Sequence, residues 1–268
     1  MKSFIANSNK KLSKLVFSYC EDLSYSDFQK ALRNRDVKIN GVRVSKDVLV
    51  DKGDKIDIYY VPKKVDMCSI VFVDQNILVI NKFSGFSSES VYENLKKEYN
   101  GLGFIHRLDT NTSGLMIFSL NQSAETELLL GFKNRTFLKE YRTEVVGKFS
   151  EKHKVLEGYL LKDSTTSTVK VFDKKEKGAV YIKTEYNVIE ERKETSIISV
   201  ILHTGKTHQI RAHLSHVGHP ILGDGKYGDY EMNKRYKVSS QVLCAHRLVL
   251  YFSKEQKLAY LNGREFII

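Results

Sequence analysis

The stretch "FIHRLDTNTSGLMIFSL", residues 104 to 120, sets the problem that this chain poses. Its middle resembles the first half of a calcium-binding loop, because oxygen-bearing side chains alternate from Asp109 up to a glycine, Gly114. The twelfth position of such a loop requires a glutamate, and here it is Leu120, at the end of an apolar run. The pattern therefore favours a polar turn that leads directly into a buried strand over a calcium site.

A polar turn in front of a buried strand is a rigid mount for a side chain at the edge of a cleft. Asp109 stands in that turn, and Arg107, two residues earlier, could reach a phosphate or a base. His106 precedes it and is a second candidate for RNA contact. The alternative is that Asp109 only forms hydrogen bonds within its own turn.

A second unusual stretch is the histidine-rich run "HTGKTHQIRAHLSHVGH", residues 203 to 219. Zinc sites on helices place histidines four residues apart with a carboxylate nearby, whereas the spacings here differ and no acid follows until Asp224. We therefore predict no metal and expect neutral hydrogen-bonding or RNA-facing histidines. Lys206 and His208 are the candidates in this run for RNA contact.

Two further residues are candidates for the same cleft. Arg211 lies beside the apolar Ile210 and Leu214, so it either extends its guanidinium to solvent or pairs with a carboxylate. Tyr141, in "LKEYRTEVVG", could stack on a base, although a tyrosine in a strand is usually a core residue.

Composition limits the class of protein. The net charge of +11 indicates a polyanionic partner, because neutralising phosphates releases condensed counterions. The cysteines match neither a metal pattern nor a disulfide framework, which favours the reducing cytoplasm (Cys20, Cys68, Cys244). There is no apolar window long enough to span a membrane and no glycine-rich nucleotide motif, so we expect no membrane contact and no cofactor.

The N-terminal part concentrates positive charge. It is expected to fold as two helices followed by short strands, with Ser24 as a helix N-cap and a hairpin at Asn40-Gly41. Six basic residues between positions 30 and 46 face a single acid, which suggests a surface that follows RNA phosphates. A merely solvated basic face is the alternative. The basic residues are Lys30, Arg33, Arg35, Lys38, Arg43 and Lys46.

The remainder of the chain alternates many short strands with few helices. One helix is expected at residues 123–135 with Ser123 as N-cap, and another at 207–218, ending at Gly218. Strands grouped with helices, without strict alternation, predict an α+β domain with a mixed, mostly antiparallel sheet. We divide the chain into an N-terminal module at 12–61, a linker at 62–69 and a catalytic domain at 70–268.

Taken together, these segments resemble the RluA-type RNA pseudouridine synthases. "HRLDTNTSGL" is similar to the catalytic motif of that family, and "DQNILVINKFSG", "KEYRTEVVG", "HTGKTHQIRAHLSHVGHPILGDGKYG" and "CAHRLVLYF" are similar to its other conserved segments. The stretch "SYSDFQKALRNRDVKINGVRV" resembles the αL-type RNA-binding module first known from a small-subunit ribosomal protein. Arg35 departs from that module, which often carries glycine at this position.

The resemblance implies roles for the candidate residues. Asp109 would be the nucleophile or base, Tyr141 the active-site tyrosine, Arg211 its salt-bridging arginine, and Arg107 the arginine that helps displace the target base. The sequence departs from the family where proline, alanine and arginine are usual, at Phe83, Thr143 and Lys206 respectively. Lysine at 206 makes a point contact where arginine could form a fork.

The resulting hypothesis is a monomeric enzyme that isomerises uridines in structured RNA, with large-subunit ribosomal RNA as the expected substrate. Two alternatives stay open at this point: a transfer-RNA pseudouridine synthase, and a non-catalytic RNA-binding factor for ribosome assembly. The candidate RNA-binding residues are His106, Arg107, Lys206 and His208 in the catalytic domain, and Arg33, Arg35, Lys38 and Arg43 in the N-terminal module.

Overall fold

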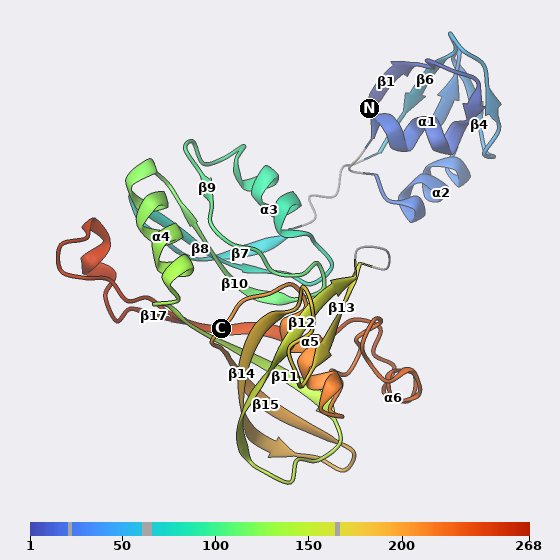
Figure 1. Ribbon diagram of the computed structural model, residues 1–268. Helices are drawn as coiled ribbons and strands as arrows, with labels where there is room; N and C mark the ends of the chain where they lie inside the picture. The colour runs from blue at the N-terminus through green and yellow to red at the C-terminus, as the bar shows by residue number, and fades with distance from the viewer. Residues whose placement is uncertain (21–22, 61–65, 164–166) are drawn as a thin grey trace. The chain divides into compact units, whose positions relative to one another are not determined.

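The computed structural model describes residues 1–20, 23–60, 66–163 and 167–268 (Figure 1). The chain divides into two compact units, Met1–Asp66 and Met67–Ile268. The first half of the predicted linker, residues 62–65, lies outside the described residues, as does residue 61. Its last two positions, 68 and 69, belong to the first strand of the larger unit rather than to a linker.

The N-terminal unit contains a four-stranded antiparallel sheet, two helices and a separate two-stranded sheet. The sheet order is β1-β6-β3-β4, and its first strand extends the unit ahead of the predicted start at residue 12. The strands are β1 (Lys2–Ile5), β3 (Val37–Ile39), β4 (Val42–Val44) and β6 (Lys55–Ile58), with β2 (Lys10–Lys11) paired to β5 (Leu49–Val50). The helices are α1 (Leu12–Tyr19) and α2 (Tyr25–Arg33), and their apolar faces cover the core with Leu15, Phe28 and Ile56 among its members.

Local signals in this unit behave as the sequence predicts. The Ser24 hydroxyl accepts a hydrogen bond from the Asp27 amide at 3.1 Å and caps α2. Asn40 and Gly41 both have positive φ, 50° and 82°, as a two-residue hairpin turn requires. Arg35 also has positive φ, at 57°. That left-handed conformation explains why glycine suits this position in the αL-type modules that the sequence resembles.

The larger unit is built on a sheet of eleven strands, and the predicted mixed, mostly antiparallel α+β fold is confirmed. Its main order is β13-β12-β14-β15-β11-β16-β10-β8-β7, with β9 beside β10 and β17 beside β16. The pair β10–β16 is parallel, while the other named pairs are antiparallel.

The elements of the larger unit follow the chain in this order. The strands up to the middle of the sheet are β7 (Cys68–Val73), β8 (Ile77–Lys82), β9 (Gly103–Phe104), β10 (Ser113–Ser119) and β11 (Leu138–Val146). A meander follows with β12 (His153–Asp163), β13 (Thr168–Phe172), β14 (Val180–Glu191) and β15 (Thr195–Leu202), and the chain ends with β16 (Leu243–Val249) and β17 (Glu265–Ile267). The helices are α3 (Ser88–Leu95), α4 (Gln122–Asn134), α5 (Gln209–His216) and α6 (Tyr230–Tyr236), with the 3-10 helix η1 at Lys257–Leu261.

Strand β10 is buried on both faces. Leu115 and Ile117 pack into one cluster with residues of α4, whereas Met116 and Phe118 pack into another with residues of α3. A strand covered on both sides has no polar face, so its sequence is a continuous apolar run. Burial on both faces explains the apolar run at residues 115–120, and it places the preceding turn, which contains Asp109, at the edge of the core.

Two predicted helix boundaries are wrong. Helix α4 begins one residue earlier than predicted because Asn121, and not Ser123, accepts the capping hydrogen bond, from the Ala124 amide at 3.0 Å. Helix α5 begins at Gln209 rather than at 207, because His208 has φ of 56° and cannot be helical. Gly218 does follow the end of α5 with a φ of 86°, the usual glycine position past a helix C-terminus.

Candidate active site

Asp109 lies in the loop between β9 and β10, and the loop is held by hydrogen bonds within the turn and from two distant segments. The Thr112 amide donates to the Asp109 carbonyl at 3.0 Å, which closes the turn. The Ser88 hydroxyl donates to the Leu108 carbonyl at 2.8 Å, and the Gln241 amide group donates to the Thr112 hydroxyl at 2.6 Å. The predicted rigid mount for a carboxylate is therefore what the geometry provides.

Lys82 supports this loop from the neighbouring strand. Its side chain is fully buried at the end of β8, and its Nζ donates to the carbonyls of Phe83, Phe86 and Thr110 at 3.0, 2.8 and 3.0 Å. Burial lowers the pKa of Lys82 to about 8, although the Asp109 charge acts in the opposite direction. One ammonium group thus ties the loop after β8 to the loop that carries Asp109.

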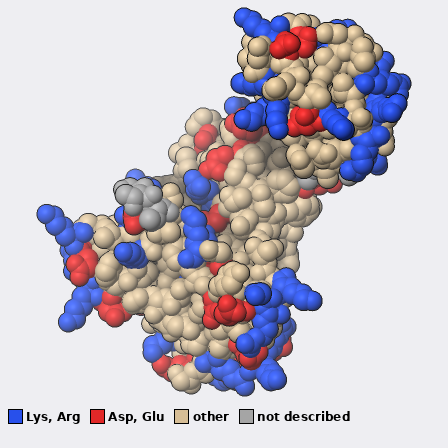
Figure 2. Space-filling model, turned by 90° about the vertical axis from the view of Figure 1, so that its right-hand side faces the viewer, with Lys and Arg blue, Asp and Glu red and all other residues tan. Residues whose placement is uncertain are grey.

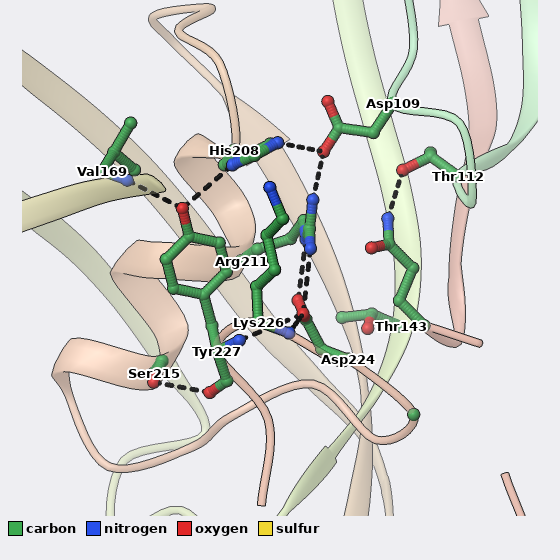
Figure 3. A network of polar contacts seen from close by, with 12 residues as sticks. Asp109, Thr112, Thr143, Val169, His208, Arg211, Ser215, Asp224, Lys226 and Tyr227 are labelled. Carbon is green, nitrogen blue, oxygen red and sulfur yellow. Dashed lines mark hydrogen bonds and ion pairs between the residues drawn. The ribbon is translucent and has the colours of Figure 1, made fainter. Parts of the chain in front are cut away.

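Arg211 joins two carboxylates (Figure 3). Its Nη1 donates to Asp109 Oδ2 at 2.8 Å, while its Nε and Nη2 donate to Asp224 Oδ2 and Oδ1 at 2.7 and 2.9 Å. Burial alone disfavours charge on Arg211, but its hydrogen bonds to Asp224 raise its pKa, so the guanidinium stays charged. Asp224 is fully buried and fixes the guanidinium plane, because a bidentate pair has one geometry.

The second oxygen of the Asp109 carboxylate is free for chemistry. Among the described residues, two groups lie close to Oδ2: Arg211 Nη1 at 2.8 Å and His208 Nε2 at 3.8 Å. Oδ1 accepts no hydrogen bond from this part of the chain (Figure 3). The carboxylate is therefore oriented by one oxygen while the other can attack or take a proton.

The site opens into a cavity of about 580 Å³, within the usual size range for ligand pockets. Tyr141, on β11, lies in its wall with Leu243 of the neighbouring strand β16. Burial, and then the charge of Asp109, raises the pKa of Tyr141, so its hydroxyl stays protonated. The structure thus brings Asp109, Tyr141 and Arg211 to one cavity from three separate elements.

The wall of the cavity is strongly basic. Of the described residues that line it, Asp109 is acidic. The basic ones, besides Arg211, are Arg107, Lys133, Arg135, Lys139 and Lys206. Lys133 and Arg135 come from the end of α4, which the sequence did not single out as functional. Arg107 forms an exposed ion pair with Glu89 at 2.9 Å, so contact with RNA would require it to leave that partner.

The predicted RNA-facing histidines differ in their environments. His106 accepts a hydrogen bond from the Ile117 amide at 3.2 Å and stacks on Phe132 at 4.5 Å. Burial lowers the pKa of His106 to about 3, with Lys139 acting in the same direction, so it is a neutral group in the cavity wall. His208 also lines the cavity, and burial lowers its pKa as well.

The rest of the histidine run does not converge. His213 contacts the Thr184 hydroxyl at 3.0 Å, and burial lowers its pKa to about 4, while His216 pairs with Asp173 at 2.8 Å. His219 stacks on Phe149 at 3.8 Å. Within the described ranges, no group of histidine, cysteine, aspartate or glutamate residues is arranged to hold a metal ion. No helix among these residues is long and apolar enough to cross a membrane.

The three departures from the family pattern are each accommodated. The Phe83 amide donates to the Met67 carbonyl at 2.9 Å, a bond that proline cannot form. The buried Thr143 hydroxyl donates to the Val242 carbonyl at 2.7 Å, so it is satisfied where alanine would be apolar. Lys206 lines the cavity as the sequence suggested.

Sequence reasoning missed Asp224 and Lys82, and it missed Tyr227, whose hydroxyl lies 2.9 Å from His208 Nδ1. A signal for the first existed, because "GDGKYG" at 223–228 places an acid in a turn after the histidine run, and a buried arginine requires a carboxylate. Lys82 gave a weaker signal as the lysine that ends the apolar run "ILVINK". Nothing in the sequence shows which carboxylate meets which cation.

Comparison with known proteins decides the family. A family model described as "RNA pseudouridylate synthase" matches residues 75–216, a segment that contains Asp109, Tyr141 and Arg211. The chain belongs to the RNA pseudouridine synthase family. It is therefore an isomerase that acts on RNA, and the resemblance to the RluA-type enzymes is confirmed.

Two relatives of the chain carry names that refer to different RNAs. The "Ribosomal large subunit pseudouridine synthase D" of Blochmanniella floridana is 32% identical over 260 residues, covering 86% of this chain and 78% of the relative. The mitochondrial "tRNA pseudouridine(32) synthase" of Saccharomyces cerevisiae is 32% identical over 238 residues, covering 84% of this chain and 52% of the relative.

A solved structure supports the fold of the synthase. The human "RNA Pseudouridylate Synthase Domain Containing 1" is 27% identical, with a TM-score of 0.62, and the match covers 70% of this chain and 80% of that one. These comparisons do not name the N-terminal unit. Its assignment as an αL-type RNA-binding module, like the domain limits and the individual site residues, stays a prediction.

Proposed function

We propose that the synthase converts specific uridines of large-subunit ribosomal RNA to pseudouridine, with Asp109 as the essential carboxylate. The proposal depends on one observation above all. Arg211 holds one oxygen of Asp109 at 2.8 Å, the other oxygen has no hydrogen-bond partner among the described residues, and Asp109 and Tyr141 line the same cavity. A carboxylate oriented in this way suits glycosyl chemistry.

The reaction explains the composition of the site. Pseudouridine formation breaks the bond between N1 of uracil and C1′ of ribose and forms a bond from C5 to C1′. C5 loses its proton and N1 gains one, so the product is an isomer of the substrate. No electrons are gained or lost, so no redox cofactor is needed. The detached uracil must be retained and turned, which suits the part of the cavity wall that Tyr141 and Leu243 form. The basic residues around the cavity would hold the phosphates of an RNA whose uridine has left its stack.

Asp109→Asn tests the catalytic role directly. The amide has nearly the same shape but is neither a nucleophile nor a base, so tritium release from RNA labelled at uracil C5 should fall to background. RNA affinity should stay within about twofold, since lysine and arginine contacts with the phosphates dominate binding and this substitution leaves them in place. Asp173→Asn is a matched control, because this exposed carboxylate pairs with His216 outside the cavity. Normal turnover by the Asp109 variant would refute the proposal.

The same assay separates the non-catalytic alternative, since an RNA-binding assembly factor would release no tritium. The transfer-RNA alternative rests on the yeast relative. It is tested by mapping pseudouridines in total RNA with and without the protein. Loss of a ribosomal position supports the proposal, and loss confined to transfer RNA replaces it. The cytoplasmic location and the monomeric state stay predictions.

A further inference from the structure

His208 and Tyr227 form a hydrogen-bonded chain that leads to the candidate catalytic carboxylate (Figure 3). The Val169 amide of β13 donates to the Tyr227 hydroxyl at 2.8 Å, and that hydroxyl lies 2.9 Å from His208 Nδ1. The other ring nitrogen, Nε2, lies 3.8 Å from Asp109 Oδ2. Val169 lies in a strand, Tyr227 in a loop, and His208 directly before α5.

This chain of contacts favours one tautomer of the imidazole. The Tyr227 oxygen already accepts the Val169 amide proton, so its own proton is available for Nδ1. A neutral imidazole that accepts at Nδ1 carries its proton on Nε2. In that tautomer the Nε2–H group faces Asp109, and a shift of roughly 0.6 Å by either side chain brings the pair to hydrogen-bond length.

The backbone places both rings firmly. His208 has φ of 56° and ψ of 17°, a left-handed conformation that persists where the surroundings impose it. The Tyr227 carbonyl accepts a hydrogen bond from the Ser215 hydroxyl at 2.8 Å, and its ring lies against the Arg211 guanidinium at 5.2 Å. Tyr227 thus contacts both His208 and Arg211.

We propose that Tyr227 and His208 are positioning residues that keep a neutral imidazole, protonated on Nε2, beside Asp109. This inference rests on the proposed role of Asp109. The Nε2–H group is a second donor to Oδ2 besides Arg211, and it directs the free Oδ1 toward the sugar or the ring. It also stabilises the carboxylate when the reaction regenerates it at the end of turnover.

Several charges act on His208, and their balance sets its protonation. Burial lowers its pKa, and the Arg211 and Lys226 charges act in the same direction, whereas Asp109 and Asp224 oppose them. The Tyr227 hydroxyl adds a donor to Nδ1, which favours the neutral form. Removal of that hydroxyl should raise the pKa of His208.

Tyr227→Phe removes the hydroxyl and keeps the ring against Arg211. We expect kcat to fall roughly tenfold, the rate equivalent of about one hydrogen bond, with KM changed less than about threefold. The acid limb of kcat against pH should move to higher pH. Tyr92→Phe is the control, because it removes a hydroxyl that donates to the Leu102 carbonyl at 3.2 Å, away from the cavity. It should leave kcat and the pH profile unchanged.

The tautomer can be observed without any substrate. In protein with nitrogen-15 histidine, two-bond proton–nitrogen correlation spectra should show His208 as the Nε2–H form. Tyr227→Phe should show a mixture of both tautomers. Because this measurement needs no turnover, it tests the hydrogen bond between Tyr227 and His208 even if RNA turnover is lost or Asp109 proves not to be catalytic.

A pair of substitutions at His208 separates positioning from general structural support. Glutamine places an N–H near the position of Nε2, whereas asparagine replaces only Nδ1, and asparagine fits the left-handed backbone better. We expect His208→Gln to retain more kcat than His208→Asn, and both to lose the acid limb. Equal losses in the two variants, a wild-type Nδ1–H tautomer, or unchanged kcat and pH profile in Tyr227→Phe would each overturn the inference.

Discussion

At the scale of single residues, the site depends on a buried arginine held between two carboxylates of different kinds. Among the described residues, Asp109 uses one oxygen on Arg211, whereas Asp224 uses both oxygens on Arg211 and also accepts the Lys226 and Tyr227 amides at 2.8 and 3.1 Å. Asp224 is therefore the structural partner, and Asp109 is the partner that the proposed function makes reactive. An arginine with only one partner could rotate and carry Asp109 with it.

Replacing Asp224 by asparagine should damage both stability and turnover. The change leaves the buried Arg211 without half of its charge compensation, which costs about 3 kcal/mol of unfolding free energy. We also expect kcat to fall at least tenfold. Urea denaturation and tritium release measure the two effects. A variant as stable as the wild type would mean that Arg211 is held by Asp109 alone.

The stability effect should depend on pH. Burial alone would raise the pKa of Asp224, but hydrogen bonds from Arg211 lower it below its usual value. A carboxyl group with a lowered pKa stabilises the fold above its unfolded pKa, about 3.9, and this contribution is lost as the pH falls through the lower folded value. The difference between wild type and Asp224→Asn should be large at pH 7 and should shrink at pH 3.

The sequence singled out the candidate reactive residues more readily than the residues that hold them in place. Asp109, Tyr141 and Arg211 stand in recognisable motifs, and the structure brings them to one cavity. Asp224 and Lys82 act through side-chain geometry with partners far along the chain, such as Thr110 for Lys82. Hydrogen bonds across such separations depend on the folded backbone, so spacing along the chain does not reveal them.

At the scale of elements, the parallel pair β10–β16 determines where the catalytic loop ends. Gly114 pairs with Ala245 in this ladder and has φ of 117°. A Cβ atom at Gly114 would lie 2.4 Å from both the nitrogen and the oxygen of Ala245. The glycine after the loop is therefore required by close approach of the two backbones as well as by its own conformation.

Gly114→Ala should destabilise the fold by more than about 3 kcal/mol, since a backbone atom cannot move aside without breaking the ladder. Gly263→Ala is a matched control, because Gly263 also has positive φ, 73°, but a methyl group there would meet no described residue within 4 Å beyond its chain neighbours. That control should cost only about 1 kcal/mol. Thermal or urea unfolding compares the two. Equal losses would show that conformation alone, and not the Ala245 contact, requires glycine at 114.

Element boundaries were predicted less well than element identities. Asn121 and Ser123 are both acceptable caps by residue type, but the Asn121 side-chain amide also donates to the Gln75 carbonyl and the Asn76 side chain at 3.2 and 3.0 Å. Those contacts fix the cap at Asn121. In α5 the left-handed His208 shortens the helix, and its contacts with distant residues impose that conformation.

At the scale of the whole molecule, the net charge of +11 is distributed over both units. In the N-terminal unit, Lys38 and Arg43 stand directly opposite each other on β3 and β4. Like charges at paired positions destabilise a sheet. On the other side of β3, Lys38 pairs with the acid Asp57 of β6, which offsets part of this repulsion. Arg33 and Arg35 lie at the end of α2, and Lys and Arg side chains cluster on the surface of this unit (Figure 2).

Replacing Arg33, Arg35 and Lys38 with glutamine should weaken RNA binding and reduce the slope of log affinity against log salt by about two. Lys174, Lys175 and Lys177, replaced in the same way, form a control with the same loss of charge on an exposed loop of the larger unit. Binding by filter retention at several salt concentrations gives both slopes. If the two triple variants had the same slope, the N-terminal unit would not be a specific RNA-binding surface.

The sequence by itself determined the family and the α+β class and supplied the candidate reactive residues, because these depend on local motifs and on the periodicity of apolar side chains. It also determined the hairpin at Asn40-Gly41 and the basic character of the N-terminal unit. Only the tertiary structure decided that Arg211 spans two carboxylates, and that His208 and Tyr227 lead to Asp109. The physical reason is that hydrogen bonds between side chains are directional and short-ranged, so they exist only once the sheet has placed distant segments within a few ångströms of each other.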